Sequence, residues 1–160
     1  MRSALITLLA LLFVASGDAA VINRAPDFSI LSAGDKSRSL RSFKGQPVVL
    51  VIADSAKSKL LKKQLKLLEE IYQQLASKGV LIVAAVATDD GPLPSNVPVA
   101  VARDGAGVAA AYGVQKGFQI AIIGRDGNLD YQTGKVQAAE RVRDVIQNSF
   151  EVQVSGRKGN

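Results

Sequence analysis

The sequence contains no cysteine, no histidine and no tryptophan, and its single methionine is Met1. Without cysteine the chain can form neither a disulfide nor a thiolate, which excludes thiol redox chemistry and cysteine nucleophiles. Without histidine it lacks the commonest general base, and without either residue type the usual zinc sites cannot form. Any catalysis would have to use Asp, Glu, Lys, Tyr, Ser or Thr. The sequence indicates no cofactor and no metal site.

Aromatic residues are also scarce, at 5% of the 160 residues, and they do not alternate with basic ones. Stacking platforms for bases are therefore poorly supported, and the composition does not favour a nucleic-acid partner. The net charge of +6 suits an anionic partner such as an envelope polymer or lipid headgroups, although it also serves solubility. A chain of this length forms one domain that needs no disulfide or metal to hold it.

The first twenty residues have the pattern of a secretory signal peptide. Arg2 precedes the apolar run 4–15, and small residues end the segment at Ala19 and Ala20. The run is shorter than the roughly 20 residues of a membrane span, which predicts cleavage after Ala19 or Ala20. We therefore expect a periplasmic or secreted protein with no stable membrane span after cleavage. An uncleaved membrane anchor is the alternative.

Residues 21–154 read as one domain in which apolar runs alternate with amphipathic segments. VVLVIA (48–53) and VLIVAAVA (80–87) are nearly continuous apolar runs, typical of strands buried on both faces of a sheet. Between them, leucines recur at spacings of three and four over residues 58–78, which predicts an amphipathic helix that Gly79 ends. Two buried strands around one helix predict a right-handed parallel βαβ unit.

Shorter patterns predict the remaining elements. We expect strands at 28–31, 99–102, 119–123 and 129–132, and helices at 105–112 and 138–150. Asp104 caps the first of these helices and Gly113 ends it, while 125–128 form a hairpin turn. The segment GAGVAA (105–110) formally fits a dinucleotide-binding fingerprint, but its helix is too short for that role. Residues 155–160 are expected to form a flexible basic tail.

Three segments together resemble a known superfamily. They are APDFSILSAGDKSRSLRSFKGQPVVLVIA (25–53), VAAAYGV (108–114) and IAIIGRDGNL (120–129). Their motifs and order, over about residues 25–150, resemble those of the redoxins, which comprise peroxiredoxins of the AhpC/TSA type and thiol-disulfide reductases. The resemblance implies a thioredoxin-like α/β fold with three layers, α/β/α, around a central mixed sheet, and with an N-terminal β-hairpin extension. It also implies oxidoreductase activity.

The residues on which that activity depends are missing. Aligned on residues 51–53, the two thiols of a Cys-x-x-Cys motif fall on Ala56 and Lys59, and a peroxidatic cysteine falls at or next to Lys59 or Leu60. The cis-proline of the family falls near Phe118, where we expect a trans peptide bond. The sequence thus predicts a cysteine-less divergent member with vestigial redox positions at Ala56, Lys59 and Phe118 and no catalytic residue.

Small polar residues and lysines fill the junction between the strand 48–53 and the helix 58–78. The candidate binding residues are Ser55, Lys57, Ser58, Lys59, Lys62 and Lys63, with Lys66 one turn further on. Lysines oppose the helix dipole at this end, whereas backbone amides at a helix start attract anions. We therefore expect a site for a carboxylate, a phosphate or an acidic partner surface. The alternative is a solvated lysine face opposite the leucines.

Three functional interpretations follow. The first is an exported, non-catalytic binding or scaffold protein whose partner is a protein or an anionic ligand. The second is a redoxin-family antioxidant or oxidoreductase with no identifiable thiol mechanism. The third is an anion- or acidic-polymer-binding protein acting through the lysine-rich start of the helix 58–78. We favour the first, because reduction of peroxides or disulfides in this superfamily requires a thiolate.

Overall fold

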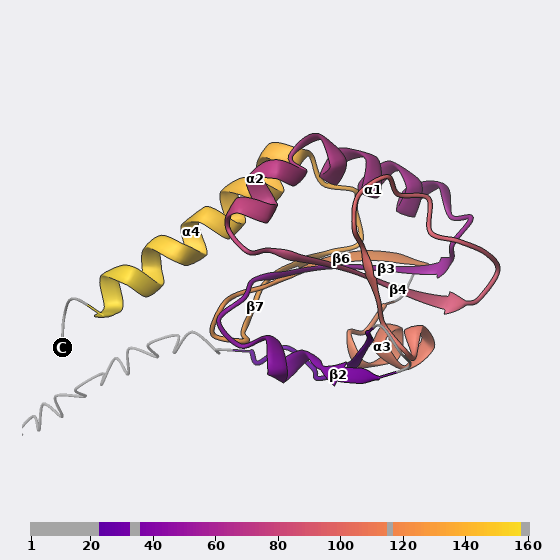
Figure 1. Cartoon of the computed structure of the whole chain (residues 1–160), viewed down its shortest axis with the longest axis horizontal. Helices are drawn as coiled ribbons and strands as arrows, with labels where there is room; N and C mark the ends of the chain where they lie inside the picture. Colours follow the sequence, from indigo (N-terminus) through magenta and orange to yellow (C-terminus); the bar gives the residue numbers. More distant parts are fainter. Residues whose placement is uncertain (1–22, 33–35, 115–116, 158–160) are drawn as a thin grey trace, which may run out of the picture.

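Five strands form the central sheet of a computed structural model that describes residues 23–32, 36–114 and 117–157 (Figure 1). In sheet order they are β5 (Ala100–Val101), β4 (Leu81–Thr88), β3 (Val48–Ser55), β6 (Phe118–Ile123) and β7 (Leu129–Thr133). The strand β3 pairs in parallel with β4 and antiparallel with β6, so the sheet is mixed as expected. The signal peptide expected at 1–20 lies outside the described residues.

The central strand β3 is buried on both faces, which explains its continuous apolar sequence. Successive side chains of a strand point to opposite faces of the sheet, and those of β3 enter two different cores. Val49, Val51 and Ala53 belong to one core, and Val48, Leu50 and Ile52 belong to the other. The predicted parallel βαβ unit is confirmed, because Val48 pairs with Leu81 and the intervening chain is helical.

Helices cover the two faces unequally. The helices α1 (Lys59–Glu70), α2 (Tyr72–Ser77) and α4 (Ala139–Arg157) lie on one face, whereas α3 (Gly105–Ala111) and the N-terminal hairpin lie on the other (Figure 1). The hairpin consists of β1 (Ser29–Leu31) and β2 (Ser37–Ser39) and is followed by the 3₁₀ turn η1 (Leu40–Phe43). This arrangement confirms the expected three layers and N-terminal hairpin extension.

The local signals around α3 and the β6–β7 hairpin are also confirmed. The Asp104 carboxylate accepts a hydrogen bond from the Gly107 amide at 2.9 Å and so caps α3, as the sequence predicts. Between β6 and β7, the Gly127 amide donates to the Gly124 carbonyl oxygen at 3.0 Å and closes the turn. Element ends differ from the expected ones by a residue or two, as is usual for patterns read from sequence.

The helix expected at 58–78 is not continuous. It is interrupted at Ile71, whose φ of −113° and ψ of 12° are not helical. The Ile71 amide donates to the Leu68 carbonyl oxygen at 3.3 Å, which tightens the turn, and the Leu75 amide returns to the Ile71 carbonyl oxygen at 3.0 Å. A β-branched side chain fits a helix interior less well than leucine does. The interruption leaves Ile71 buried with Leu68 and Leu75 in the same core.

The C-terminal helix is longer than the expected 138–150. It runs to Arg157, so the first three residues of the predicted tail 155–160 are helical, and the last three lie outside the described residues. The reason is that no proline or glycine interrupts the chain between Phe150 and Gly156. Among the helices of the described residues, none is both long and apolar enough to cross a membrane.

One buried polar residue was not anticipated from the sequence. Gln64 lies among the leucines of α1 and is fully buried. Its Nε2 donates to the Gln137 carbonyl oxygen at 3.1 Å, and its Oε1 accepts from the Gln137 amide at 2.7 Å. These two bonds compensate the burial of the side chain and tie α1 to the segment that leads into α4.

Candidate functional site

Asp90, in the connection after β4, holds the junction between β3 and α1. Its Oδ1 accepts a hydrogen bond from the Ala56 amide at 2.9 Å, and its Oδ2 accepts one from the Ser55 hydroxyl. Ser55 Oγ in turn accepts from the Lys57 amide at 3.0 Å. The Ser55 hydroxyl lowers the pKa of Asp90 most, with smaller contributions from the Ala56 amide and Lys57 that act against partial desolvation. The carboxylate of Asp90 is therefore held ionised.

This role of Asp90 was missed from the sequence, because the residue lies 34 positions beyond Ala56. Only the pairing of β3 with β4 brings the two chain segments together. As a result, the Ser55 hydroxyl and the Ala56 amide, two donors that an external anion could have used, already bind a carboxylate of the protein itself. An anion site at this junction would have to rely on the lysines.

The three residues predicted to be vestigial redox positions lie around the end of β3. Ala56 is 5% exposed and Phe118 2% exposed, whereas Lys59, the first residue of α1, is exposed. Phe118 pairs with Ala53 across β3 and β6, and its side chain belongs to the core under α1. The peptide bonds of the described residues are all trans. No side chain at these three positions can form a thiolate.

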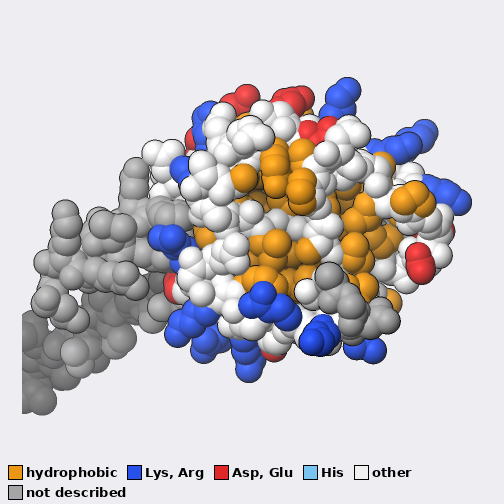
Figure 2. Space-filling view, in the orientation of Figure 1, with side chains coloured by type: hydrophobic (Ala, Val, Ile, Leu, Met, Phe, Trp, Pro, Cys, Tyr) orange, Lys and Arg blue, Asp and Glu red, His pale blue; other side chains and the backbone are white. Residues whose placement is uncertain are grey.

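A pocket of about 330 Å³ opens beside Ala56 at the carboxyl ends of β4 and β5. Its lining is mainly apolar and includes Leu31, Val86, Pro92, Leu93 and Val101, with Asp89 and Arg103 as charged members. Leu31, on the N-terminal hairpin, is 43% exposed. The apolar side chains at the centre of the face in Figure 2 lie where Figure 1 places the β4–β5 connection. The junction between β3 and α1 therefore has a concave, mainly apolar surface beside Ala56.

The lysines of the candidate site are more exposed than its serines. Ser55 and Ser58 are half-buried, and Ser58 caps α1 by accepting from the Leu61 amide at 3.4 Å. Lys57, Lys59, Lys62, Lys63 and Lys66 are all exposed, and within the described part of the chain none of them forms an ion pair. Figure 2 shows basic side chains projecting from the upper right edge, where Figure 1 places the start of α1.

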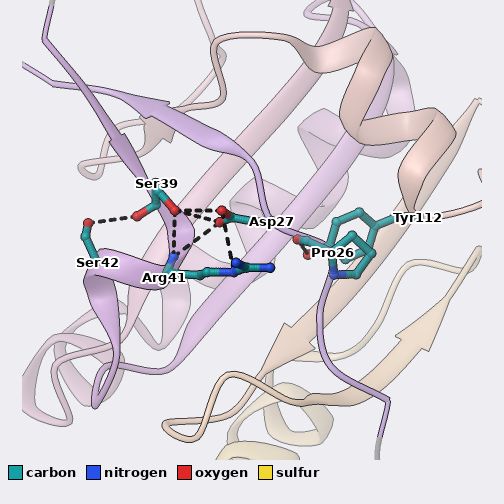
Figure 3. A network of polar contacts seen from close by, with 6 residues as sticks. All are labelled: Pro26, Asp27, Ser39, Arg41, Ser42 and Tyr112. Carbon is teal, nitrogen blue, oxygen red and sulfur yellow. Dashed lines mark hydrogen bonds and ion pairs between the residues drawn. The ribbon is translucent and has the colours of Figure 1, made fainter.

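A second polar network fixes the N-terminal segment against the other face (Figure 3). Asp27 accepts from the Ser39 hydroxyl at 2.8 Å and from the Arg41 amide at 3.3 Å, and Arg41 Nε lies 3.6 Å from its carboxylate. Tyr112, just after α3, donates from its hydroxyl to the Pro26 carbonyl oxygen at 2.9 Å. The phenol is only 4% exposed, and its pKa is raised by burial first and by the nearby Asp27 carboxylate second.

This shift predicts a loss of stability at alkaline pH. Because the folded protein holds the Tyr112 proton more tightly than the unfolded chain does, the contribution of the phenol is complete below its ordinary pKa of 10 and is lost as the pH rises above it. The free energy of unfolding should exceed that of Tyr112→Phe by about 1 kcal/mol at neutral pH. Above pH 10 this difference should shrink by about 1.4 kcal/mol per pH unit. Urea unfolding of both proteins across this range measures it, and a difference that stays constant would contradict the prediction.

In the residues that the structure describes, no group of three or more acidic side chains could hold a metal ion. Two acidic residues of the β6–β7 hairpin already accept hydrogen bonds from the protein itself. Asp126 accepts from the Asn128 amide at 3.0 Å, and Asp130 accepts from the Ser149 hydroxyl at 2.6 Å. The site thus consists of an emptied strand–helix junction, an apolar pocket beside it and a row of exposed lysines.

Known structures share this fold. A thiol:disulfide interchange protein, DsbE, of Chlorobium tepidum has a TM-score of 0.65 and 19% identity, over 79% of this chain and 95% of that one. The peroxidoxin BcpB of Mycobacterium tuberculosis has a TM-score of 0.61 and 17% identity, over 81% and 95%. The exposed lipoprotein thioredoxin Etrx1 of Streptococcus pneumoniae has a TM-score of 0.60 and 18% identity, over 77% and 99%. At these identities the likeness defines the fold.

Fold and junction together define a thioredoxin-fold protein from which the redox thiols are absent. The model of the AhpC/TSA family matches residues 21–132, which is more than half of the chain, so the protein belongs to that family. No curated protein matches the sequence. The resemblance proposed from the three sequence segments is therefore confirmed, including its cysteine-less character.

Proposed function

We propose that this protein is an exported, non-catalytic member of the AhpC/TSA family that binds a protein partner. The observation that carries the proposal concerns the two positions on which the thiols of the superfamily fall. They are occupied by the buried Ala56 and the exposed Lys59, and Asp90 accepts a hydrogen bond from the Ala56 amide. Reduction of peroxides or disulfides by this fold needs a thiolate, and the chain has no cysteine to supply one.

The pocket beside Ala56 supports a binding role. It brings Leu31, which is 43% exposed, together with other apolar side chains and with charged residues, and an apolar patch rimmed by polar residues is typical of an interaction site. Solved structures of the same fold include one described as a protein disulfide isomerase, whose name indicates that it acts on other proteins. The N-terminal signal pattern supports export, and the similar thioredoxin of Streptococcus pneumoniae is described as an exposed lipoprotein.

The lysines of α1 support a second candidate function, the binding of anions or acidic polymers. The observation in its favour is that five exposed lysines lie in and just before α1. None of them forms an ion pair among the described residues, although the charge of Lys57 acts on the Asp90 carboxylate. A solvated lysine face explains their exposure equally well. The two candidates are compatible, because the lysines do not line the pocket beside Ala56.

Catalytic inactivity is tested directly with the purified chain. We expect no rate above a buffer control in insulin reduction with dithiothreitol or in consumption of hydrogen peroxide, because no side chain can form a thiolate. A redoxin with its cysteines, assayed in parallel, shows that the assays respond. A reproducible rate that co-purifies with the protein and is lost on heat unfolding would refute the non-catalytic proposal.

The partner is sought by cross-linking capture from the exported fraction of the source cells. Leu31→Asp places a charge at the rim of the pocket, whereas Arg24→Asp changes an exposed residue at the opposite end of β3. We expect a protein that is captured by the native chain and by Arg24→Asp but not by Leu31→Asp. Equal capture by all three baits would contradict a partner site at the pocket.

A further inference from the structure

We propose that the lysine stripe of α1 binds the phosphate headgroups of an anionic lipid surface. The lysine stripe is defined as Lys59, Lys62, Lys63 and Lys66, and the inference rests on the second candidate function above. Their spacing of three and four residues places them on one side of the helix, along about 10 Å of its axis. The buried residues of α1, which include Leu61, Leu65 and Leu68, occupy the opposite side.

The lysines of the stripe form no ion pair with any residue that the structure describes. Lys59 is the first residue of α1, where the helix dipole disfavours a cation, and the first turn contains no acid. The arginines of α4 are different, because the Arg143 guanidinium pairs with Asp144 at 3.1 Å and Arg141 lies over the Tyr131 ring. The first turns of the stripe therefore weaken the helix that carries them, and the exposed lysines are available to an external anion.

The form of this surface favours an extended anionic layer over a small ligand. No lysine of the stripe lines any of the pockets described for this molecule, and α1 is the outer layer of the fold (Figure 1). Several amide donors next to it are already used, since the Ala56 amide binds Asp90 and the Lys62 amide binds the Ser58 carbonyl oxygen. What remains is a row of exposed ammonium groups on the outer side of α1.

A lipid surface fits these properties better than a protein does. Headgroup phosphates are laterally mobile and can gather under four ammonium groups without a shaped complementary surface. Leu60, which is 45% exposed, lies next to the stripe on the same helix and can enter the headgroup region. Binding of this kind is weak, reversible and lowered by salt.

The test is sedimentation of the full chain with phosphatidylcholine vesicles that contain or lack phosphatidylglycerol. Lys59→Glu/Lys62→Glu reverses half of the stripe and creates two favourable Glu-to-Lys pairs at a spacing of four, with Lys63 and Lys66. The control is Arg24→Glu/Lys44→Glu, which changes the net charge equally at two exposed residues far from α1. All proteins share the N-terminal apolar segment, whose own contribution is read from the neutral vesicles.

We expect the native chain and the control to bind phosphatidylglycerol vesicles, and the stripe variant to bind at least about tenfold more weakly. We also expect the stripe variant to melt at about 2 °C higher temperature, because the substitution satisfies the helix dipole. Equal losses in both variants would show a non-specific charge effect, and a lower melting temperature would show that the lysines stabilise the fold. Either result would overturn the proposal.

A second probe separates this inference from the function on which it rests. Polyglutamate could be bound by the native chain and not by the stripe variant, while the native chain does not bind the vesicles. In that case the lipid inference fails and the anion-binding function stands. If the native chain binds neither the vesicles nor polyglutamate, both fail. Binding to the vesicles that the stripe variant abolishes supports both.

Discussion

The Ala56→Cys variant is expected to react with iodoacetamide at pH 7 at least about tenfold more slowly than Lys59→Cys. Only the thiolate attacks the reagent, so the rate follows the thiol pKa. Position 56 is 5% exposed and its amide binds the Asp90 carboxylate, and both burial and a nearby negative charge raise a thiol pKa. Position 59 is exposed at the start of α1, where the helix dipole and the neighbouring lysines lower it.

Each variant contains a single thiol, so the measured rate belongs to the substituted position alone. Rates measured across pH give the thiol pKa of each variant. Adding Asp90→Asn should accelerate the Ala56→Cys reaction and leave Lys59→Cys almost unchanged, since only the first position lies against the carboxylate. If Ala56→Cys reacts as fast as Lys59→Cys, the junction still supports a thiolate at its first position and the account of Asp90 given above is wrong.

The second prediction concerns stability. Gly105→Ala is expected to lower the free energy of unfolding by about 3 kcal/mol, and the melting temperature by about 10 °C. A Cβ at position 105 would overlap the Val86 carbonyl group and lie 2.6 Å from the Val86 amide nitrogen. These are backbone atoms of β4, so a side-chain rotation cannot relieve the overlap, and α3 would have to move off the sheet. Helix propensity alone predicts the opposite sign, since alanine favours a helix over glycine.

Gly107→Ala, in the same helix, is the matched control. A Cβ at that position would meet only the Asp104 carboxyl group, with its Cγ at 2.8 Å, and that side chain can rotate away. The gain in helix propensity and the loss of the cap at Gly107 are each about 1 kcal/mol and nearly cancel. Thermal and urea unfolding of both variants gives the comparison. Similar stabilities for the two variants would show that the close approach of α3 to β4 does not matter.

Much of the fold follows from local patterns. The apolar runs at 48–53 and 80–87 and the leucine spacing between them predict the βαβ unit, because such runs need cover on both faces and such helices supply it. The patterns were less reliable where the chain carries no strong signal. The apolar pattern does not show the break at Ile71, because this side chain fits the pattern, and the predicted helix 138–150 ends before α4 does, because nothing before Gly156 stops a helix.

The candidate site was predictable only in its residue types. The emptied thiol positions, Ala56 and Lys59, could be located by counting from the apolar strand, and the lysines could be assigned to the exposed side of a helix. The role of Asp90 could not be found in this way, because its contact with Ala56 is made across 34 residues of chain. The same holds for Gln64, whose buried amide is satisfied by Gln137.

The sequence by itself determined what this protein lacks and how its elements follow one another, because composition and periodicity depend on each residue and its near neighbours. Without cysteine or histidine, no arrangement of the chain could restore the chemistry of its family. Only the tertiary structure decided which polar groups meet. It placed Asp90 at the junction, brought Gly105 against β4 and left the lysine stripe without an ion pair to any described residue, because each of these depends on segments that pairing and packing bring together.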